Sequence, residues 1–204
     1  MIRRVAFAIS ACALLAGGQS LFLHPLSSEQ VREAYFLGRD ADKRQSFFSH
    51  YIHYPAQPDR GPDIHLIEFR TLFEQVALKS QERWTNYDVL DAEHDYDTQP
   101  QEVVIRVFIC GSQTFSFASP PSNDAPWRPE DYLRGFEFHV SQTHPLKPQK
   151  LTEQRALFGC ADFDGFEAFL HFDPEQFAPG SVKIEVTAPN GEKVHTEFDL
   201  DVLK

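Results

Sequence analysis

The chain has 204 residues, of which 19 are basic, 30 are acidic and 42% are hydrophobic, and its formal net charge is −11. This length and apolar content are sufficient for one folded domain with a core, and they exclude a wholly disordered chain. A protein this acidic lacks the clustered Lys and Arg that attract phosphate, so we expect no nucleic acid among its partners.

The N-terminal segment, residues 1–18, has the pattern of a secretory signal peptide. Arg3 and Arg4 precede an apolar run over residues 5–16, and Gly17 and Gly18 follow it. A positive start, an apolar stretch and small residues in this order predict cleavage after Gly18 or two residues later. We therefore expect a secreted or periplasmic protein.

An uncleaved membrane anchor is the alternative. The apolar residues extend over 5–23, close to the shortest length that spans a bilayer, but the Gly-Gly-Gln-Ser sequence at 17–20 interrupts them. In this alternative the protein contacts the inner membrane through that segment alone. If cleavage removes Arg3 and Arg4, the remaining 17 basic and 30 acidic residues give a net charge of −13.

Cleavage also removes Cys12 and leaves Cys110 and Cys160. Two thiols far apart in a chain that enters an oxidising compartment predict one disulfide. Two buried free thiols are the alternative interpretation.

Residues 19–98 carry mainly helical signals. Ser27 with the early carboxylate of Glu29 predicts a helix start, and helical spacing of apolar residues continues until Gly38. A second helix is expected over 41–51. A linker rich in Pro and Gly follows it.

Three more segments complete this region. Residues 64–69 read as a strand, and residues 73–79 fit helix and strand periods equally well. Residues 81–97 contain no Gly or Pro and carry apolar residues at a spacing of three, so we expect one helix that ends before Pro100.

Residues 99–204 carry β signals. The apolar, β-branched run 102–110 predicts a central strand that is buried on both faces. Alternating apolar residues predict further strands, and Asn190-Gly191 predicts the hairpin between the last two. The inward stripes are expected at Phe136, Phe138 and Val140; Phe166, Ala168, Leu170 and Phe172; Val182, Ile184 and Val186; and Val194, Thr196, Phe198 and Leu200.

These elements predict an α+β fold in which N-terminal helices pack on a C-terminal antiparallel β-sandwich and share one continuous core with it. The architecture resembles an immunoglobulin sandwich only loosely, because no tryptophan lies where such a core would hold one. Architecture of this kind implies no function.

The main candidate for chemistry is a set of histidines on outward strand faces. Each has a Glu on the same side of its strand, because side chains repeat with a period of two. The groups are Glu137 with His139, Glu167 with His171, and His195 with Glu197. If their strands were neighbours, these imidazoles would suit zinc or copper; a solvated polar face is the alternative.

Weaker cation candidates follow from local spacing. They are His50 with His53; Asp88, Asp91 and Asp95 within the acidic run that includes Glu93 and Asp97; and Asp162, Asp164 and Glu167. The two histidines are equally compatible with an ordinary helix terminus. The acidic run is equally compatible with an exposed helix face, and the set at 162–167 matches only part of a calcium-binding loop. No group has diagnostic spacing, so we assign no catalytic, cofactor-binding or metal-binding residue.

Most phenylalanines are expected to fill the core. Those on predicted inner faces are Phe47, Phe48, Phe69, Phe73, Phe108, Phe136, Phe138, Phe166 and Phe172. Phe169 lies on the opposite face of its strand, so a second sheet or the helices should cover it. Phe115, Phe117 and Trp127 belong to a Pro-rich loop at 111–129, where they either form a contact surface or fix the loop.

The sequence lacks the usual catalytic signatures, among them a Gly-x-Ser-x-Gly elbow and His-Glu-x-x-His. We therefore expect a non-enzymatic binding or structural module of the cell envelope, with the 111–129 loop contacting a protein partner. The alternative is a metal-binding or metal-dependent hydrolytic periplasmic protein that uses His139, His171 and His195.

Overall fold

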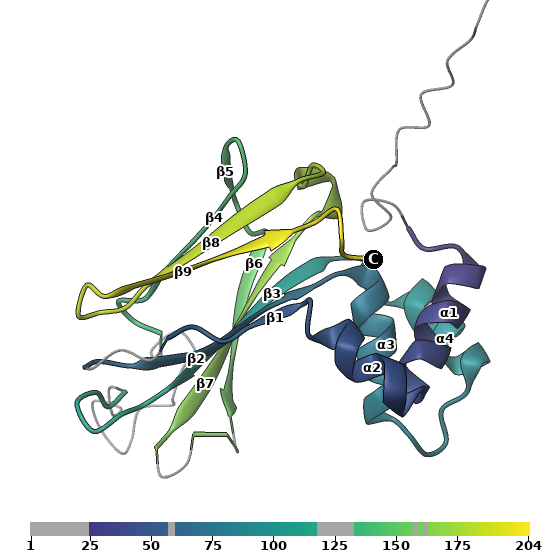
Figure 1. Ribbon diagram of the computed structural model, residues 1–204, viewed down its shortest axis with the longest axis horizontal. Helices are drawn as coiled ribbons and strands as arrows, with labels where there is room; N and C mark the ends of the chain where they lie inside the picture. The colour runs from purple at the N-terminus through teal and green to yellow at the C-terminus, as the bar shows by residue number, and fades with distance from the viewer. Residues whose placement is uncertain (1–24, 57–59, 118–132, 157–158, 161–162) are drawn as a thin grey trace, which may run out of the picture.

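Helices and strands are segregated in the structure, a computed structural model that describes residues 25–56, 60–117, 133–156, 159–160 and 163–204. The signal-peptide prediction therefore lies outside the described residues. The helices of the described part gather at one end of the molecule, and two antiparallel sheets form the rest (Figure 1). The predicted α+β fold is confirmed, and its likeness to an immunoglobulin sandwich remains loose.

Helix α1 (Ser28–Arg39) begins as the sequence predicts. The Ser27 hydroxyl accepts a hydrogen bond from the Gln30 N–H at 3.3 Å, and the Gln30 side chain accepts one from the Ser27 N–H at 2.8 Å. This reciprocal cap satisfies backbone donors that a helix start leaves unpaired. Gly38 does not end the helix; a Cβ there would lie 2.0 Å from the Ala77 carbonyl oxygen, so glycine allows α1 to approach α3 closely.

Two helix predictions require correction. Helix α2 (Ala41–Phe48) ends before Tyr51. The single helix expected over 81–97 is wrong, because the ambiguous segment 73–79 belongs to α3 (Leu72–Glu82) and α4 (Val89–Thr98) starts separately. Between them Asn86 adopts a positive φ of 58°, and the Asp88 carboxylate caps the new helix.

The larger sheet has the strand order β1-β2-β3-β7-β6, and the smaller one has β5-β4-β8-β9. The larger sheet comprises β1 (Ile52–His53), β2 (Asp63–Arg70), β3 (Val103–Cys110), β7 (Gly165–Phe172) and β6 (Lys150–Ala156). The smaller comprises β5 (Pro145–Leu146), β4 (Glu137–Ser141), β8 (Ser181–Thr187) and β9 (Lys193–Asp199).

The main core lies between these sheets. The predicted stripes of β7 and β8 are wholly buried there, and β3 is buried on both faces except at Arg106. Among the described residues, eight buried aromatic side chains of this core come from both sheets and their connections: Tyr51, Phe69, Phe117, Phe136, Phe166, Phe172, Phe177 and Phe198. Their burial is the main contribution to the stability of the sandwich.

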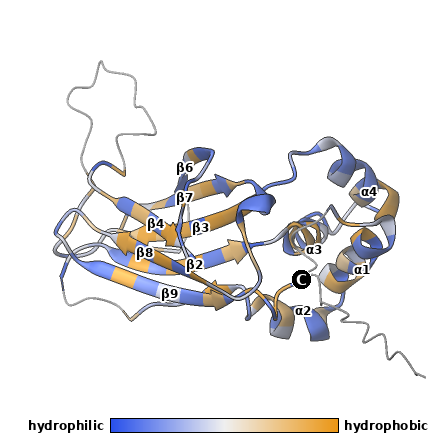
Figure 2. Ribbon diagram, turned by 90° about the horizontal axis from the view of Figure 1, so that it is seen from above, coloured by the Kyte–Doolittle hydropathy of each residue, from blue (hydrophilic) through white to orange (hydrophobic). Residues whose placement is uncertain are grey.

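The helices form a second hydrophobic cluster beside the ends of the strands, so they leave the sheet faces uncovered (Figures 1 and 2). Phe47 of α2 packs against both clusters. The C-terminus lies at this junction, where the Tyr51 hydroxyl accepts a hydrogen bond from the Lys204 N–H at 2.8 Å. The helical part and the sandwich are thus joined through Phe47, Tyr51 and the last residue.

A disulfide joins Cys110, at the end of β3, to Cys160, in the connection between β6 and β7. This confirms the predicted pairing and excludes the alternative of two free thiols. No helix within the described ranges is long and apolar enough to cross a membrane.

Candidate functional site

The outward face of the smaller sheet carries a row of three polar residues. In the strand register, His139 of β4 lies opposite Glu185 of β8, and Glu185 lies opposite His195 of β9. Side chains opposite one another on neighbouring strands are close enough to interact. The row therefore places a carboxylate between two imidazoles, and we call it the histidine row.

The surface around the histidine row is hollowed. A depression of about 520 Å³ extends over β4, β8 and β9. Its outward polar side chains are His139, Ser141, Lys183, Glu185, His195 and Glu197. Acidic, basic and imidazole groups thus line one depression, which is the chemistry of a polar binding site.

Charge pairing organises this face. The Lys193 ammonium donates a hydrogen bond to Glu185 at 2.8 Å. This bond, together with the positive charges nearby, holds the pKa of the Glu185 carboxyl below its usual range. Glu137 lies 3.4 Å from the His139 Nε2 atom, as expected from their shared strand face.

His171 does not belong to this site. It lies on β7 of the larger sheet, where its Nδ1 contacts Glu102 at 2.8 Å and its Nε2 contacts Thr152 at 3.0 Å. The predicted convergence of His139, His171 and His195 is therefore wrong. His139 and His195 share a sheet face with Glu185 between them, whereas His171 is fixed by its own partners.

Glu167 also has another role. It lies on the outer face of the larger sheet and pairs with Arg106 of β3, which also contacts Glu68 of β2 at 3.0 Å. Arg70 pairs with the same Glu68 carboxylate at 2.6 Å. These side chains form a charge ladder across three strands, with Glu68 only 3% exposed. Glu167 thus pairs with Arg106, whereas His171 contacts Glu102 and Thr152.

Phe169 lies beside this charge ladder. We predicted that a second sheet or the helices would cover its side chain, and the structure differs. Among the described residues, the smaller sheet packs on the opposite face and the helices lie beside the strand ends (Figure 1), and the Arg70 guanidinium lies 5.9 Å from the Phe169 ring centroid. The long Arg70 side chain partly shields this ring, because the apolar stem of such a side chain covers surface while its charged head remains in water.

The His50 and His53 pair does not share a helix face. Helix α2 ends before His50, and His53 lies in β1 opposite Ile67. The expectation of an i, i+3 ligand pair on a helix end is therefore wrong.

The acidic run at 88–97 serves local structure. Asp88 and Asp91 form the capping box of α4, whereas Asp95 pairs with Lys79 at 2.6 Å and Glu93 pairs with Arg32 at 2.7 Å. Bonds to Lys79 lower the pKa of the Asp95 carboxyl. Most of these carboxylates are thus committed to caps and ion pairs.

The residues that resemble part of a calcium-binding loop also have ion-pair partners. Asp164 pairs with Arg155 at 2.5 Å, and Glu167 pairs with Arg106. Asp162 lies outside the described residues. The two described carboxylates face different arginines, so they do not form one cation site.

Part of the 111–129 loop is described. Phe117 is buried against Phe166, with ring centroids 4.4 Å apart, and Phe115 packs edge-on against Phe117. These two rings belong to the main core and fix the start of the loop. The rest of the loop, with Trp127, lies outside the described residues, and its predicted protein contact stays a prediction.

Sequence reasoning recognised His139 and His195 but missed the residues between them. The period of two in β8 places Lys183 and Glu185 on the outward face of the strand, whereas Val182 and Ile184 are buried on its inner face. That signal was present in the sequence. What the sequence lacked was the strand order, which puts β8 between the two histidine strands.

Compared with known proteins, the chain matches no family model, no curated protein sequence and no solved structure.

Proposed function

We propose that the protein is an exported, non-catalytic binding module of the cell envelope, and that it binds its partner on the outward face of the smaller sheet. The observation that carries this proposal is the hollow of about 520 Å³ around the histidine row. Three adjacent strands supply its polar lining, so the groups are held by hydrogen-bonded backbone. A site on rigid strands loses little entropy when it binds.

Export is supported by two independent features. The N-terminal segment has the order of charged, apolar and small residues of a signal peptide. The disulfide is of the kind that persists in oxidising compartments. Together these two features support the proposed envelope location.

The chemistry of the face favours a protein partner with charges of both signs. Lys183 and Lys193 alternate with Glu185 and Glu197 over the sheet surface. Such a pattern recognises a complementary array of charges and gives specificity and fast association. We expect the binding to weaken as ionic strength rises, because exposed charges are screened.

Affinity capture with a matched control tests this proposal. The mature chain is used as bait for solubilised envelope proteins, beside a face variant, Lys183→Glu with Lys193→Glu, and a control of equal charge change, Lys43→Glu with Lys150→Glu. A partner held by the wild type and the control, and lost with the face variant, is the expected result. Equal capture by all three, or no capture by the wild type, contradicts the proposal.

A second candidate function rests on the histidine row itself. Two imidazoles with a carboxylate between them are suitable ligands for zinc or copper, provided the exposed side chains turn toward one ion. Calorimetric titration of the oxidised protein with Zn²⁺ checks this, with His144→Ala as control. Removal of His139 or His195 should weaken binding about tenfold or more, since even partners of ligands contribute about that much.

A further inference from the structure

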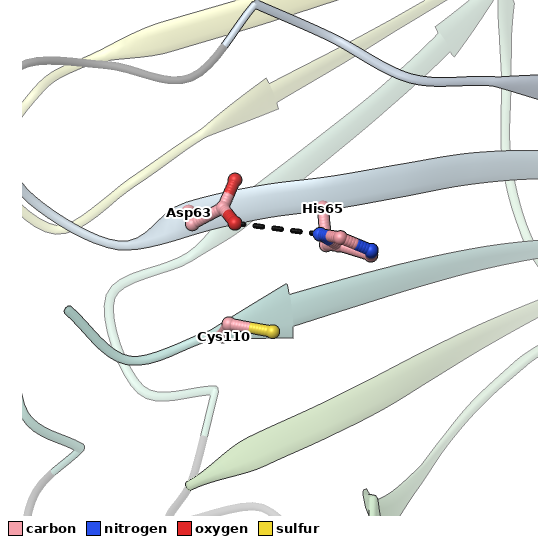
Figure 3. A group of neighbouring side chains, drawn as sticks. All are labelled: Asp63, His65 and Cys110. Atoms are coloured by element: carbon pink, nitrogen blue, oxygen red, sulfur yellow. Dashed lines mark ion pairs between the residues drawn. The ribbon is translucent and has the colours of Figure 1, made fainter. Parts of the chain in front are cut away.

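A second cluster of metal-ligand residues lies at the edge of the larger sheet, away from the histidine row. The Asp63 carboxylate, the His65 imidazole and the Cys110 sulfur each offer a ligand atom, and these atoms all lie within 4.8 Å of one another (Figure 3). The Asp63 Oδ2 and His65 Nδ1 atoms are 3.5 Å apart. Among the described residues, this is the one group of His, Cys and acidic side chains gathered so closely.

The strand register explains this gathering. Asp63 of β2 lies directly opposite Cys110 of β3. The register then shifts between Ile64 and Leu66, so His65 is the extra residue of a β-bulge. Bulges redirect side chains and are common beside functional sites. Here the bulge keeps His65 on the side of the sheet where Asp63 and Cys110 lie (Figure 3).

Aromatic rings hold His65 in place. Its ring lies 5.4 Å from that of Phe108 and 6.2 Å from that of Tyr54, both edge-on. The side chain is nevertheless 36% exposed, and that of Asp63 is 18% exposed. The imidazole is thus restrained in orientation and still open to an ion from solvent.

Cys160 is not one of the three clustered groups, but its bond to Cys110 places a further sulfur directly beside them. Its loop is packed closely against the sheet: a Cβ at Gly165 would lie 2.4 Å from the Cys160 sulfur, and one at Gly159 would lie 2.9 Å from the Phe108 ring. Glycine at both positions lets the loop reach the edge of the sheet.

We propose that reduction of the Cys110–Cys160 disulfide converts this cluster into a zinc site made of Asp63, His65, Cys110 and Cys160. One nitrogen, one oxygen and two sulfur ligands form a four-coordinate set of the kind that zinc prefers. In the oxidised protein both sulfurs are engaged in the disulfide, so only Asp63 and His65 remain as ligands. The site is therefore open to zinc in one redox state alone.

The chemical balance of the switch is simple. A dithiol reductant transfers two electrons and two protons to the disulfide and becomes a disulfide itself, which leaves two thiols on the protein. Zinc then displaces both thiol protons, binds the two thiolates, and takes up the carboxylate and the neutral imidazole. Oxidation of the thiolates by a disulfide oxidant re-forms the bond and releases the ion.

Cobalt substitution tests the site directly, because thiolate ligation of Co²⁺ gives a strong charge-transfer absorption that histidine and carboxylate ligands do not give. The protein, with His139→Ala and His195→Ala to remove the histidine row, is titrated with Co²⁺ before and after reduction by a phosphine. We expect the absorption only after reduction, and its loss when Zn²⁺ is added. Asp63→Asn and His65→Ala should each weaken Co²⁺ binding about tenfold or more.

Three results overturn the proposal. The first is a reduced protein that binds no Co²⁺ through thiolate. The second is thiolate binding that Asp63→Asn and His65→Ala leave unchanged, which would show two cysteines acting without the strand residues. The third is a reduced protein that loses its near-ultraviolet circular dichroism and does not regain it with Zn²⁺, because a site built by the fold must stabilise that fold. Asp88→Asn with His94→Ala is the matched control and should bind as the parent does.

Discussion

The Tyr51 hydroxyl and the Lys204 backbone N–H form a hydrogen bond of 2.8 Å across 153 residues of chain. Tyr51 is 1% exposed and lies in the chain between the end of α2 and the start of β1. Thr71, at the start of α3, donates its hydroxyl to the Lys204 carbonyl oxygen. The end of the chain is thus fastened between helices and sandwich by two buried hydroxyls.

Replacement of Tyr51 by Phe should therefore destabilise the protein modestly. The ring keeps its packing against Phe47, whereas the Lys204 backbone N–H loses its hydrogen-bond acceptor. We expect a loss of about 1 kcal/mol in the free energy of unfolding, the usual net value of such a bond. Urea denaturation measures it, and Tyr54→Phe, whose side chain is 64% exposed, is the control that should change little.

The disulfide should contribute more to the free energy of unfolding than the Tyr51 hydrogen bond does. It closes a loop over a sequence separation of 50 residues, and the chain-entropy model gives about 4 kcal/mol for a loop of this size. Denaturation with and without a phosphine reductant, in the presence of a chelator, measures this contribution. The double variant Cys110→Ser with Cys160→Ser should be insensitive to the reductant; a wild type that is equally insensitive would contradict the prediction.

Arg106 should be essential to the charge ladder. Replacement by Met leaves Glu68 and Glu167 without their shared guanidinium in a region where Glu68 is almost fully buried. We expect a loss of about 3 kcal/mol, in the range for breaking a buried ion pair. The control is Arg155→Met, because Arg155 and Asp164 are both more than half exposed and their pair should matter little.

Glu74 predicts a specific dependence of stability on pH. Burial in α3, with Glu68 nearby, raises the pKa of its carboxyl well above the usual range. The unfolded chain then ionises at lower pH than the folded one, so this carboxyl lowers stability as pH rises above the usual Glu range. Relative to Glu74→Gln, the wild type should lose up to about 1.4 kcal/mol per pH unit there.

Denaturation midpoints over a pH series compare the two proteins. At pH values low enough to protonate Glu74 in the unfolded chain as well, they should be almost equally stable. Glu29→Gln, an exposed carboxylate in the first turn of α1, should follow the wild type throughout. Parallel curves for wild type and Glu74→Gln would show that Glu74 is charged in the folded protein.

The sequence predicted correctly those helix starts and turns that are determined by residues close together in the chain. Ser27 caps α1 where expected, and Asn190-Gly191 turns between β8 and β9. The helix boundary near Asn86 was missed because Trp84, Tyr87 and Leu90 keep a helical spacing across the turn. Asp88 was the available sign, since its carboxylate caps the first turn of α4.

Strand β6 was missed for a different reason. It lies at the edge of its sheet and carries Lys150, Glu153 and Arg155 among its seven residues, so it lacks an apolar alternation. The same limit applies to the sites. Periodicity placed His139 and His195 on outward faces, but only the strand order showed which carboxylate lies between them and that His171 belongs elsewhere.

The pairing of β3 with β7 has a consequence for how the protein folds. Val103 lies opposite Phe172, and the other pairs of this ladder follow in unbroken register to Cys110 and Gly165. Neither strand can find its partner through a short hairpin, so this alignment is expected to be slow. A slip of one residue would turn Cys110 to the inner face of the sheet, away from Cys160. The disulfide can thus close only in chains whose two strands have aligned correctly. Its presence in a molecule therefore shows that β3 and β7 paired in the correct register in that molecule.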